Sequence, residues 1–246
     1  MPYWIPIVFF IIAFSYSTVG FGGGSSYLAL LVLADFSYQS IPPMALVCNL
    51  VVTASAFRNY FRAGHFEAKK VLPFVIFSIP LAYAGGRILI GQQLFSLLLG
   101  IALLAVVVRL VLPQKSMQPV KDVSARHIWA LGLPAGAVLG FISGLLGIGG
   151  GIFLSPLLLM LRWTDVKGAG ACASFFIFLN SAAALFGHLH KGSIEINSLI
   201  PLVVAVFLGG QLGSRLGAYE VSSTRLGWVM AGLILCASIK LICGGI

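Results

Sequence analysis

Long apolar stretches separated by short polar segments dominate the chain. They cover residues 3–34, 41–61, 71–91, 94–112, 128–161, 168–190, 198–217 and 225–244. Their residues are mainly Leu, Ala, Ile, Val, Phe and Gly, without the strict apolar–polar alternation that is typical of outer-membrane barrel strands. Because a transmembrane helix needs about 20 apolar residues, the pattern predicts an all-α integral membrane protein.

Two of these stretches are too long for one simple span. As a single helix, residues 3–34 would extend about 48 Å, against a hydrocarbon core of about 30 Å. Each long stretch has a glycine triplet near its middle, Gly22–Gly24 in the first and Gly149–Gly151 in the second. Glycine disfavours helix and permits unusual backbone angles. Each stretch is therefore predicted to be a broken helix, either a kinked span or a re-entrant hairpin.

The two halves of the chain repeat each other. Three motifs recur in the same order and at nearly the same spacing: Gly20–Gly24 with Gly147–Gly151, Gly85–Ile88 with Gly213–Leu216, and Gly64–Glu67 with Gly192–Glu195. Internal repeats are a common way to build transporters. The sequence thus predicts two homologous four-element repeats, residues 1–112 and 128–246, joined by a basic connecting loop at residues 113–127.

The basic residues favour the hairpin alternative. If all eight stretches were simple spans, ten of the 15 Lys and Arg residues would lie on one side of the membrane and five on the other. If the two broken stretches are hairpins, twelve lie on one side, leaving Arg87, Lys191 and Lys240 opposite. Cytoplasmic loops carry the excess of Lys and Arg. The stronger bias predicts inverted repeats, a cytoplasmic connecting loop and both termini outside.

Composition excludes most soluble classes of protein. Hydrophobic residues make up 59% of the chain and charged residues 9%, with a net charge of +9, whereas soluble domains are about 25% charged. So few charges cannot cover a soluble surface of this size. The positive charge is therefore interpreted as membrane topology rather than nucleic-acid binding, and the lipid bilayer is the expected partner. Oligomeric state is not predicted.

The glycine breaks are the candidate binding site. A break that opens a helix inside the membrane presents free N–H groups and the positive end of the helix dipole, which suits a small anion. The alternative is that the glycines only allow helices to pack closely. The candidate residues are Gly22, Gly23, Gly24 and Ser25 from the first break and Gly149, Gly150 and Gly151 from the second.

Four further polar residues are candidates. Asn49 and Asn180, loose counterparts in the two halves, must find partners within apolar segments, either another helix or a substrate. Arg87 and Arg215 occupy equivalent places near segment ends, where they either extend to the membrane interface or control access of an anion.

Nothing in the sequence indicates an enzyme. The six carboxylates lie in loops or at segment ends, and the four cysteines show neither CxxC spacing nor His neighbours, so no catalytic, metal or cofactor site is predicted.

The glycine motifs also carry a family resemblance. Val19–Gly24 and Gly144–Gly151, the latter followed by Pro156, resemble the signatures of the TauE/SafE family of sulfite exporters, and the Arg87 and Arg215 motifs fit as well. The resemblance covers essentially the whole chain, although Phe21 and the Ser25–Ser26 pair replace bulkier apolar residues of the family pattern.

The resemblance implies a bacterial inner-membrane permease for sulfur-containing anions such as sulfite, thiosulfate or organosulfonates. Combined with the glycine breaks, it gives the hypothesis that the anion binds between the two breaks, with Ser25, Asn49 and Asn180 adding hydrogen bonds, and crosses by alternating access. Two alternatives stay open. One is an anion channel, and the other is a membrane sulfur-relay component that uses the Cys48 thiol.

Overall fold

The computed structural model describes residues 3–34, 36, 40–88, 123–189, 196–222 and 232. Within these residues the fold is entirely helical, without strands. The helices are α1 (Trp4–Ser17), α2 (Gly24–Leu33), α3 (Ile41–Arg62), α4 (Ala68–Gly86), α6 (Ala125–Leu146), α7 (Gly151–Met160), α8 (Val166–His188), α9 (Ile196–Arg215) and the π-helix η1 (Leu216–Glu220). The predicted segments at 94–112 and 225–244, and most of the connecting loop, lie outside the described residues.

Within the described residues, five helices are long and apolar enough to cross a membrane: α3, α4, α6, α8, and α9 together with η1. Helices α1 and α7 are apolar but shorter. Large apolar side chains remain exposed on the outward faces of the helices, among them Ile7, Val138, Ile200 and Phe207. Such a surface needs lipid around it, so the prediction of an all-helical membrane protein is confirmed.

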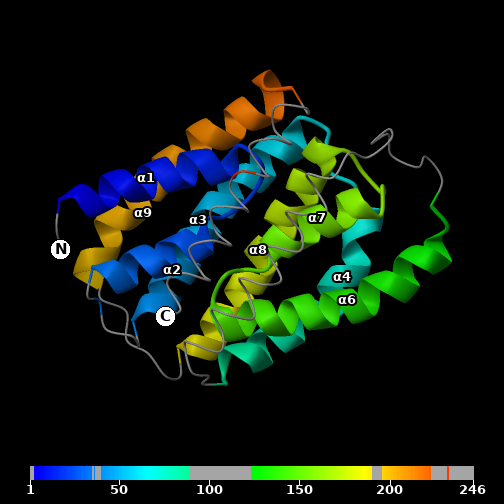
Figure 1. The fold of residues 1–246 in the computed structure, drawn as a ribbon, viewed down its shortest axis with the longest axis horizontal. Helices are drawn as coiled ribbons and strands as arrows, with labels where there is room; N and C mark the ends of the chain where they lie inside the picture. Colours follow the sequence, from blue (N-terminus) through cyan, green and yellow to red (C-terminus); the bar gives the residue numbers. More distant parts are fainter. Residues whose placement is uncertain are drawn as a thin grey trace.

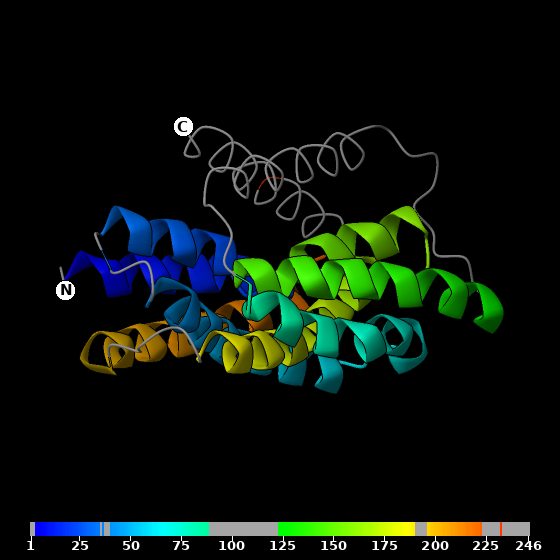
Figure 2. The same ribbon diagram turned by 90° about the horizontal axis from the view of Figure 1, so that it is seen from below.

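Both long stretches are broken helices, as predicted. The first divides into α1 and α2, and the second into α6 and α7. In Figures 1 and 2, α2 runs back toward the end of the molecule at which α1 begins, and α7 turns back along α6 in the same way. Stacking of the Phe9 and Tyr27 rings, with centroids 4.7 Å apart, joins the two arms of the first pair.

Glycine seams hold the outer helices together. Along α6, Gly132, Gly136, Gly140 and Gly144 lie against successive turns of α4, so closely that a β-carbon on any of them would clash. Along α9, Gly209 and Gly213 approach the α1 backbone in the same way. In both seams the two helices run in the same direction. Helices α3 and α8 pack together at the centre, α3 also against α9 and α8 against α4 (Figure 1).

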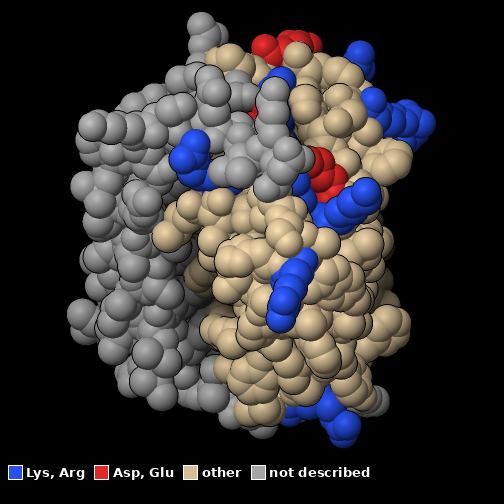
Figure 3. Space-filling view, turned by 90° about the vertical axis from the view of Figure 1, so that its right-hand side faces the viewer, with Lys and Arg blue, Asp and Glu red and all other residues tan. Residues whose placement is uncertain are grey.

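The described charges collect at one end of the molecule. Of the nine described Lys and Arg residues, eight lie at the joined ends of α3 and α4, the start of α6, the turn between α7 and α8, or the end of α9: Arg58, Arg62, Lys69, Lys70, Arg126, Arg162, Lys167 and Arg215. Contacts such as Lys167 Nζ to the Ala218 carbonyl, at 3.2 Å, hold these parts together. We call this the basic end (Figure 3). Arg87 follows α4 at the opposite end.

Candidate functional site

The first break depends on glycine for two reasons. Helix α1 ends at Ser17, and Gly20 and Gly23 then adopt φ values of +81° and +88°, a backbone region that side chains with a β-carbon disfavour. A β-carbon on Gly20 would also clash with the backbone of Gly170 on α8. The chain can therefore turn here and approach α8 closely only because these positions are glycine.

The second break has the same character. Helix α6 ends at Gly147 with φ +68°, and Gly149 and Gly150 follow with φ values of +85° and +73°. Helix α7 then begins at Gly151, and no side chain caps its N-terminus. Because the first N–H groups of a helix have no partner within it, the start of α7 is available to another acceptor.

Asn49 joins the two breaks. It is fully buried on α3, and its Nδ2 donates a hydrogen bond of 2.9 Å to the carbonyl oxygen of Ile148 in the second break. Its Oδ1 lies against Gly22 of the first break, where a β-carbon would clash with it. A β-carbon on Gly24 would lie 2.8 Å from the Ile148 oxygen. The structure thus brings both breaks and Asn49 together in the interior.

Buried oxygen atoms without a hydrogen-bond partner gather around this junction. Five side-chain oxygens are in this state among the described residues: Tyr27 Oη, Asn49 Oδ1, Ser143 Oγ, Asn180 Oδ1 and Ser181 Oγ. Four of them adjoin a break. Asn49 lies beside Gly22, while Tyr27, Ser181 and Ser143 adjoin the β-carbon positions of Gly23, Gly149 and Gly150 at 3.1, 2.7 and 3.1 Å. An unpaired buried polar atom costs about 1–3 kcal/mol, so their concentration makes the junction the candidate site for a polar ligand.

Sequence reasoning missed Tyr27, Ser143 and Ser181, whose unpartnered oxygens lie beside the breaks. Ser181 contacts Gly149 as Thr53 contacts Gly22, and Thr53 and Ser181 are separated by the same spacing as the repeated motifs. Comparison of the two halves could have found Ser181. Ser143 precedes the second glycine motif by one helical turn, and no sequence signal distinguished it.

Asn49 and Asn180, loose counterparts in the sequence, occupy different places relative to the two breaks. Ile177 stands at the position of the second half that the motif spacing assigns to Asn49. It contacts Gly149 and Gly151 as Asn49 contacts Gly22 and Gly24. Asn180 lies further along α8, fully buried, and its Nδ2 bonds to the Phe176 carbonyl of its own helix at 2.8 Å.

The remaining candidates are spread over different parts of the structure. Ser25 is 6% exposed in the first turn of α2. Arg87 and Arg215 are exposed at opposite ends of the molecule, and Arg87 lies over the Tyr83 ring. Cys48 is fully buried in an apolar cluster with residues of α1 and α2.

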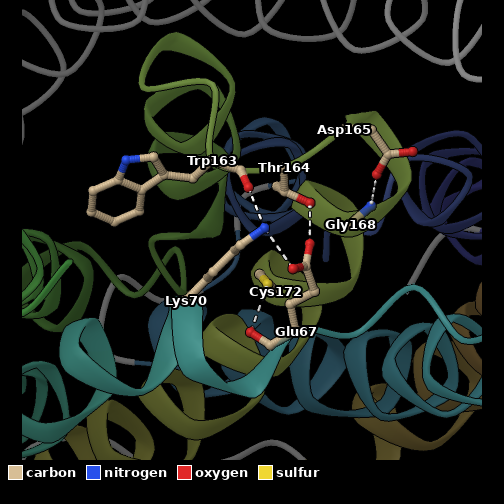
Figure 4. A network of polar contacts seen from close by, with 7 residues as sticks. All are labelled: Glu67, Lys70, Trp163, Thr164, Asp165, Gly168 and Cys172. Carbon is tan, nitrogen blue, oxygen red and sulfur yellow. Dashed lines mark hydrogen bonds and ion pairs between the residues drawn. The ribbon is translucent and has the colours of Figure 1, made fainter. Parts of the chain in front are cut away.

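A separate polar network closes the basic end (Figure 4). Glu67 accepts a hydrogen bond of 2.9 Å from Thr164 and pairs with Lys70 at 2.5 Å, while Lys70 also donates to the Trp163 carbonyl. Asp165 caps α8 by accepting from the Gly168 N–H at 2.8 Å. The network ties the turn between α3 and α4 to the turn between α7 and α8.

Other features of the described chain do not suit an anion. A groove of about 580 Å³ lies between α4 and α8, lined by Ile79, Pro80, Tyr83, Ala183, Phe186 and Leu189. Its lining is almost wholly apolar. No group of three or more His, Cys, Asp or Glu side chains within the described ranges could hold a metal ion.

Broken helices that meet in the interior of a helical membrane protein are typical of transporters. Comparison with known proteins points to the same class. The family "Sulfite exporter TauE/SafE" matches residues 5–241. The chain belongs to this family and is a membrane transporter, which confirms the resemblance inferred from the glycine motifs.

Relatives cover nearly the full length. The chain is 31% identical over 240 residues to "Probable membrane transporter protein y4hK" of Sinorhizobium fredii, covering 97% of both chains. It is 25% identical to "Probable membrane transporter protein YunE" of Bacillus subtilis, covering 94% of this chain and 93% of that protein. It is 27% identical to "Probable membrane transporter protein MJ0441" of Methanocaldococcus jannaschii, covering 93% and 90%. No solved structure matches the chain significantly.

Proposed function

We propose that the protein carries small sulfur-containing anions, such as sulfite, thiosulfate or organosulfonates, across the membrane. The anion binds where the two glycine breaks meet. The observation that carries this proposal is the cluster of buried, unpartnered oxygens of Asn49, Ser143, Ser181 and Tyr27 beside the breaks. The choice of sulfur anions as the substrate class comes from the family name.

Backbone dipoles supply the positive potential at this site. Helices α2 and α7 both begin at the junction, and a helix N-terminus carries roughly half a positive charge and free N–H donors. The hydroxyls of Ser143 and Ser181, with Ser25 in the first turn of α2, add further donors. The described Lys and Arg residues lie at the ends of the molecule, so within the described part of the chain no permanent cation holds the anion, which can therefore leave again.

We further propose an inverted duplication. Two observations support it. Gly22 contacts Asn49 and Thr53 as Gly149 contacts Ile177 and Ser181, with each pair of equivalent positions separated by nearly the same spacing along the chain. Helix α4 packs along α6 as α9 packs along α1, and α4 runs away from the basic end while α9 runs toward it. In this arrangement α1–α2 and α6–α7 are re-entrant hairpins that enter from opposite sides.

The charge distribution supports an orientation. Cytoplasmic ends of membrane proteins carry the excess of Lys and Arg, so the basic end faces the cytoplasm of a bacterial inner membrane. In alternating access, the cytoplasmic side opens when the contacts of the basic-end network break and α4 moves away from the turn between α7 and α8. The Glu67–Thr164 and Lys70–Trp163 contacts join these elements and have to break for this side to open.

Reconstituted flux tests the proposal. Proteoliposomes should take up labelled sulfite with saturation and exchange it for unlabelled sulfite inside, which a channel does not do. Ser181→Ala removes a hydroxyl at the junction and should reduce the flux about tenfold, the effect of one hydrogen bond of roughly 1.4 kcal/mol.

Ser174→Ala is the matched control. Ser174 is equally buried on the same helix, but its hydroxyl already bonds to the Ala171 carbonyl at 2.8 Å. Its flux should stay at the wild-type level. Equal flux in both variants would remove Ser181 from the site, and the absence of any sulfite uptake by the wild type would overturn the substrate class.

A further inference from the structure

The orientation of the Asn49 amide is fixed by its neighbour. The Ile148 carbonyl oxygen can only accept a hydrogen bond, so the atom 2.9 Å away must be the amide nitrogen. Oδ1 is therefore the atom that lies beside Gly22, fully buried and without a partner. The junction thus presents an acceptor within a site whose other features attract an anion.

An acceptor oxygen repels the oxygens of a fully deprotonated anion. Asn49 Oδ1 therefore needs either a hydrogen-bond donor or a metal cation beside it. A metal cation is disfavoured, because the N-terminus of α2 at Gly24 carries a partial positive charge. The Ser143 and Ser181 hydroxyls, in contrast, can donate to deprotonated oxygens. One ligand that satisfies both kinds of group carries a negative charge and one acidic proton.

We infer that the site selects a monoanion that retains an O–H group, such as hydrogen sulfite, in preference to the sulfite dianion or sulfate. This inference rests on the proposed function and narrows its substrate class: sulfite binds in its hydrogen sulfite form, and thiosulfate and organosulfonates, which have no O–H at neutral pH, bind less tightly. The O–H of the anion donates to Asn49 Oδ1, and its deprotonated oxygens accept from Ser143, Ser181 and backbone N–H groups. When sulfite is the dominant form in solution, binding takes one proton from the solvent.

Within the described part of the chain, few groups near the junction could imitate this proton uptake. Among the described residues, Tyr16 on α1, Tyr27 on α2 and Cys48 on α3 are buried ionisable side chains near the junction. At the end of α8, His188 Nε2 lies 2.9 Å from the Gly144 carbonyl of α6, and histidine titrates near neutral pH. The described Lys, Arg, Asp and Glu residues lie at the ends of the molecule. His188 therefore needs its own control.

Titration calorimetry of the full-length protein in detergent, with sodium sulfite in buffers of different ionisation enthalpy, counts the protons exchanged. Well above the second ionisation of sulfurous acid, the wild type should take up about one proton per anion bound, and well below it about none. His188→Gln should give the same counts. Methanesulfonate, an anion without an O–H, should bind about 5- to 150-fold more weakly than hydrogen sulfite, because it leaves Oδ1 unpaired.

Asn49→Leu should abolish the preference for hydrogen sulfite over methanesulfonate. Asn59→Leu is the matched control on the same helix, because Asn59 bonds to Ser214 at 2.8 Å in the contact with α9, and it should keep both the preference and the proton count.

Sulfite binding without proton uptake at high pH would overturn the inference while leaving the proposed function intact. So would binding that is lost when choline replaces sodium, since Oδ1 would then serve a sodium ion. No sulfite binding at any pH would instead overturn the proposed function. The wild-type proton count decides the matter even where Asn49→Leu fails to fold.

Discussion

Substitution of Gly149 tests how tightly the junction is packed, because the cost of its backbone strain can be measured separately at another glycine. It has φ +85°, and a β-carbon there would lie 2.5 Å from Ile177 Cγ2, 2.7 Å from Ser181 Oγ and 3.3 Å from Asn49 Nδ2. Gly149→Ala therefore combines a left-handed residue with crowding among the residues of the proposed site. The strain costs about 1–2 kcal/mol and the crowding about 1–3 kcal/mol more.

Gly64→Ala isolates the strain alone. Gly64 has nearly the same φ, +79°, but nothing lies within 4 Å of its β-carbon position. The free energy of unfolding of this variant should fall by about 1–2 kcal/mol, and it should transport sulfite normally. The free energy of unfolding of Gly149→Ala should fall by about 2–5 kcal/mol in total. This variant should transport no sulfite, because the added methyl group occupies space between Asn49 and Ser181.

The assay is a pair of measurements on each variant: the thermal midpoint of unfolding in detergent, and sulfite flux in proteoliposomes containing equal amounts of folded protein. The midpoint should fall further for Gly149→Ala than for Gly64→Ala. Equal midpoints with unchanged flux in both variants would refute the reasoning, since the junction would then have room that the structure denies.

Three further predictions follow from individual contacts. Gly144→Ala places a methyl group against the α4 backbone and should cost about 3 kcal/mol through overpacking, seen as a lower thermal midpoint. Tyr60→Phe leaves the Thr18 carbonyl without its 2.5 Å hydrogen bond and should cost about 1–3 kcal/mol by the same measurement; an unchanged midpoint would contradict the contact. In a cysteine-free background, Arg62→Cys should react with an impermeant maleimide only from the cytoplasmic side and Arg87→Cys only from outside, whereas labelling of both from one side would overturn the proposed orientation.

For the part of the chain that the structure describes, the sequence was sufficient to predict the helical segments and their interruptions. The segments predicted at 41–61 and 168–190 correspond to α3 and α8 within a few residues, because apolar length alone determines which segments can span a membrane. The breaks at Gly22–Gly24 and Gly149–Gly151 were predicted because glycine clusters weaken a helix at any depth.

Contacts between segments could not be predicted in the same way. The register of α8 against the second break depends on how closely the helices pack, and this brings Ile177 and Ser181 to the break in place of Asn180. Likewise, the pairing of Glu67 with Thr164 joins turns that are 97 residues apart. No local pattern of residues specifies such a contact.

The most direct test of the central claim is to locate the bound anion. Selenite has the shape and charge of sulfite, and its selenium atom gives an anomalous diffraction signal. In crystals of the full-length protein soaked with selenite, the account predicts one anomalous peak between Gly24 and Gly149, placed so that the oxygens of the anion lie within hydrogen-bond distance of Asn49 and Ser181. A peak only at Arg87 or in the groove between α4 and α8, with none at the junction, would contradict it.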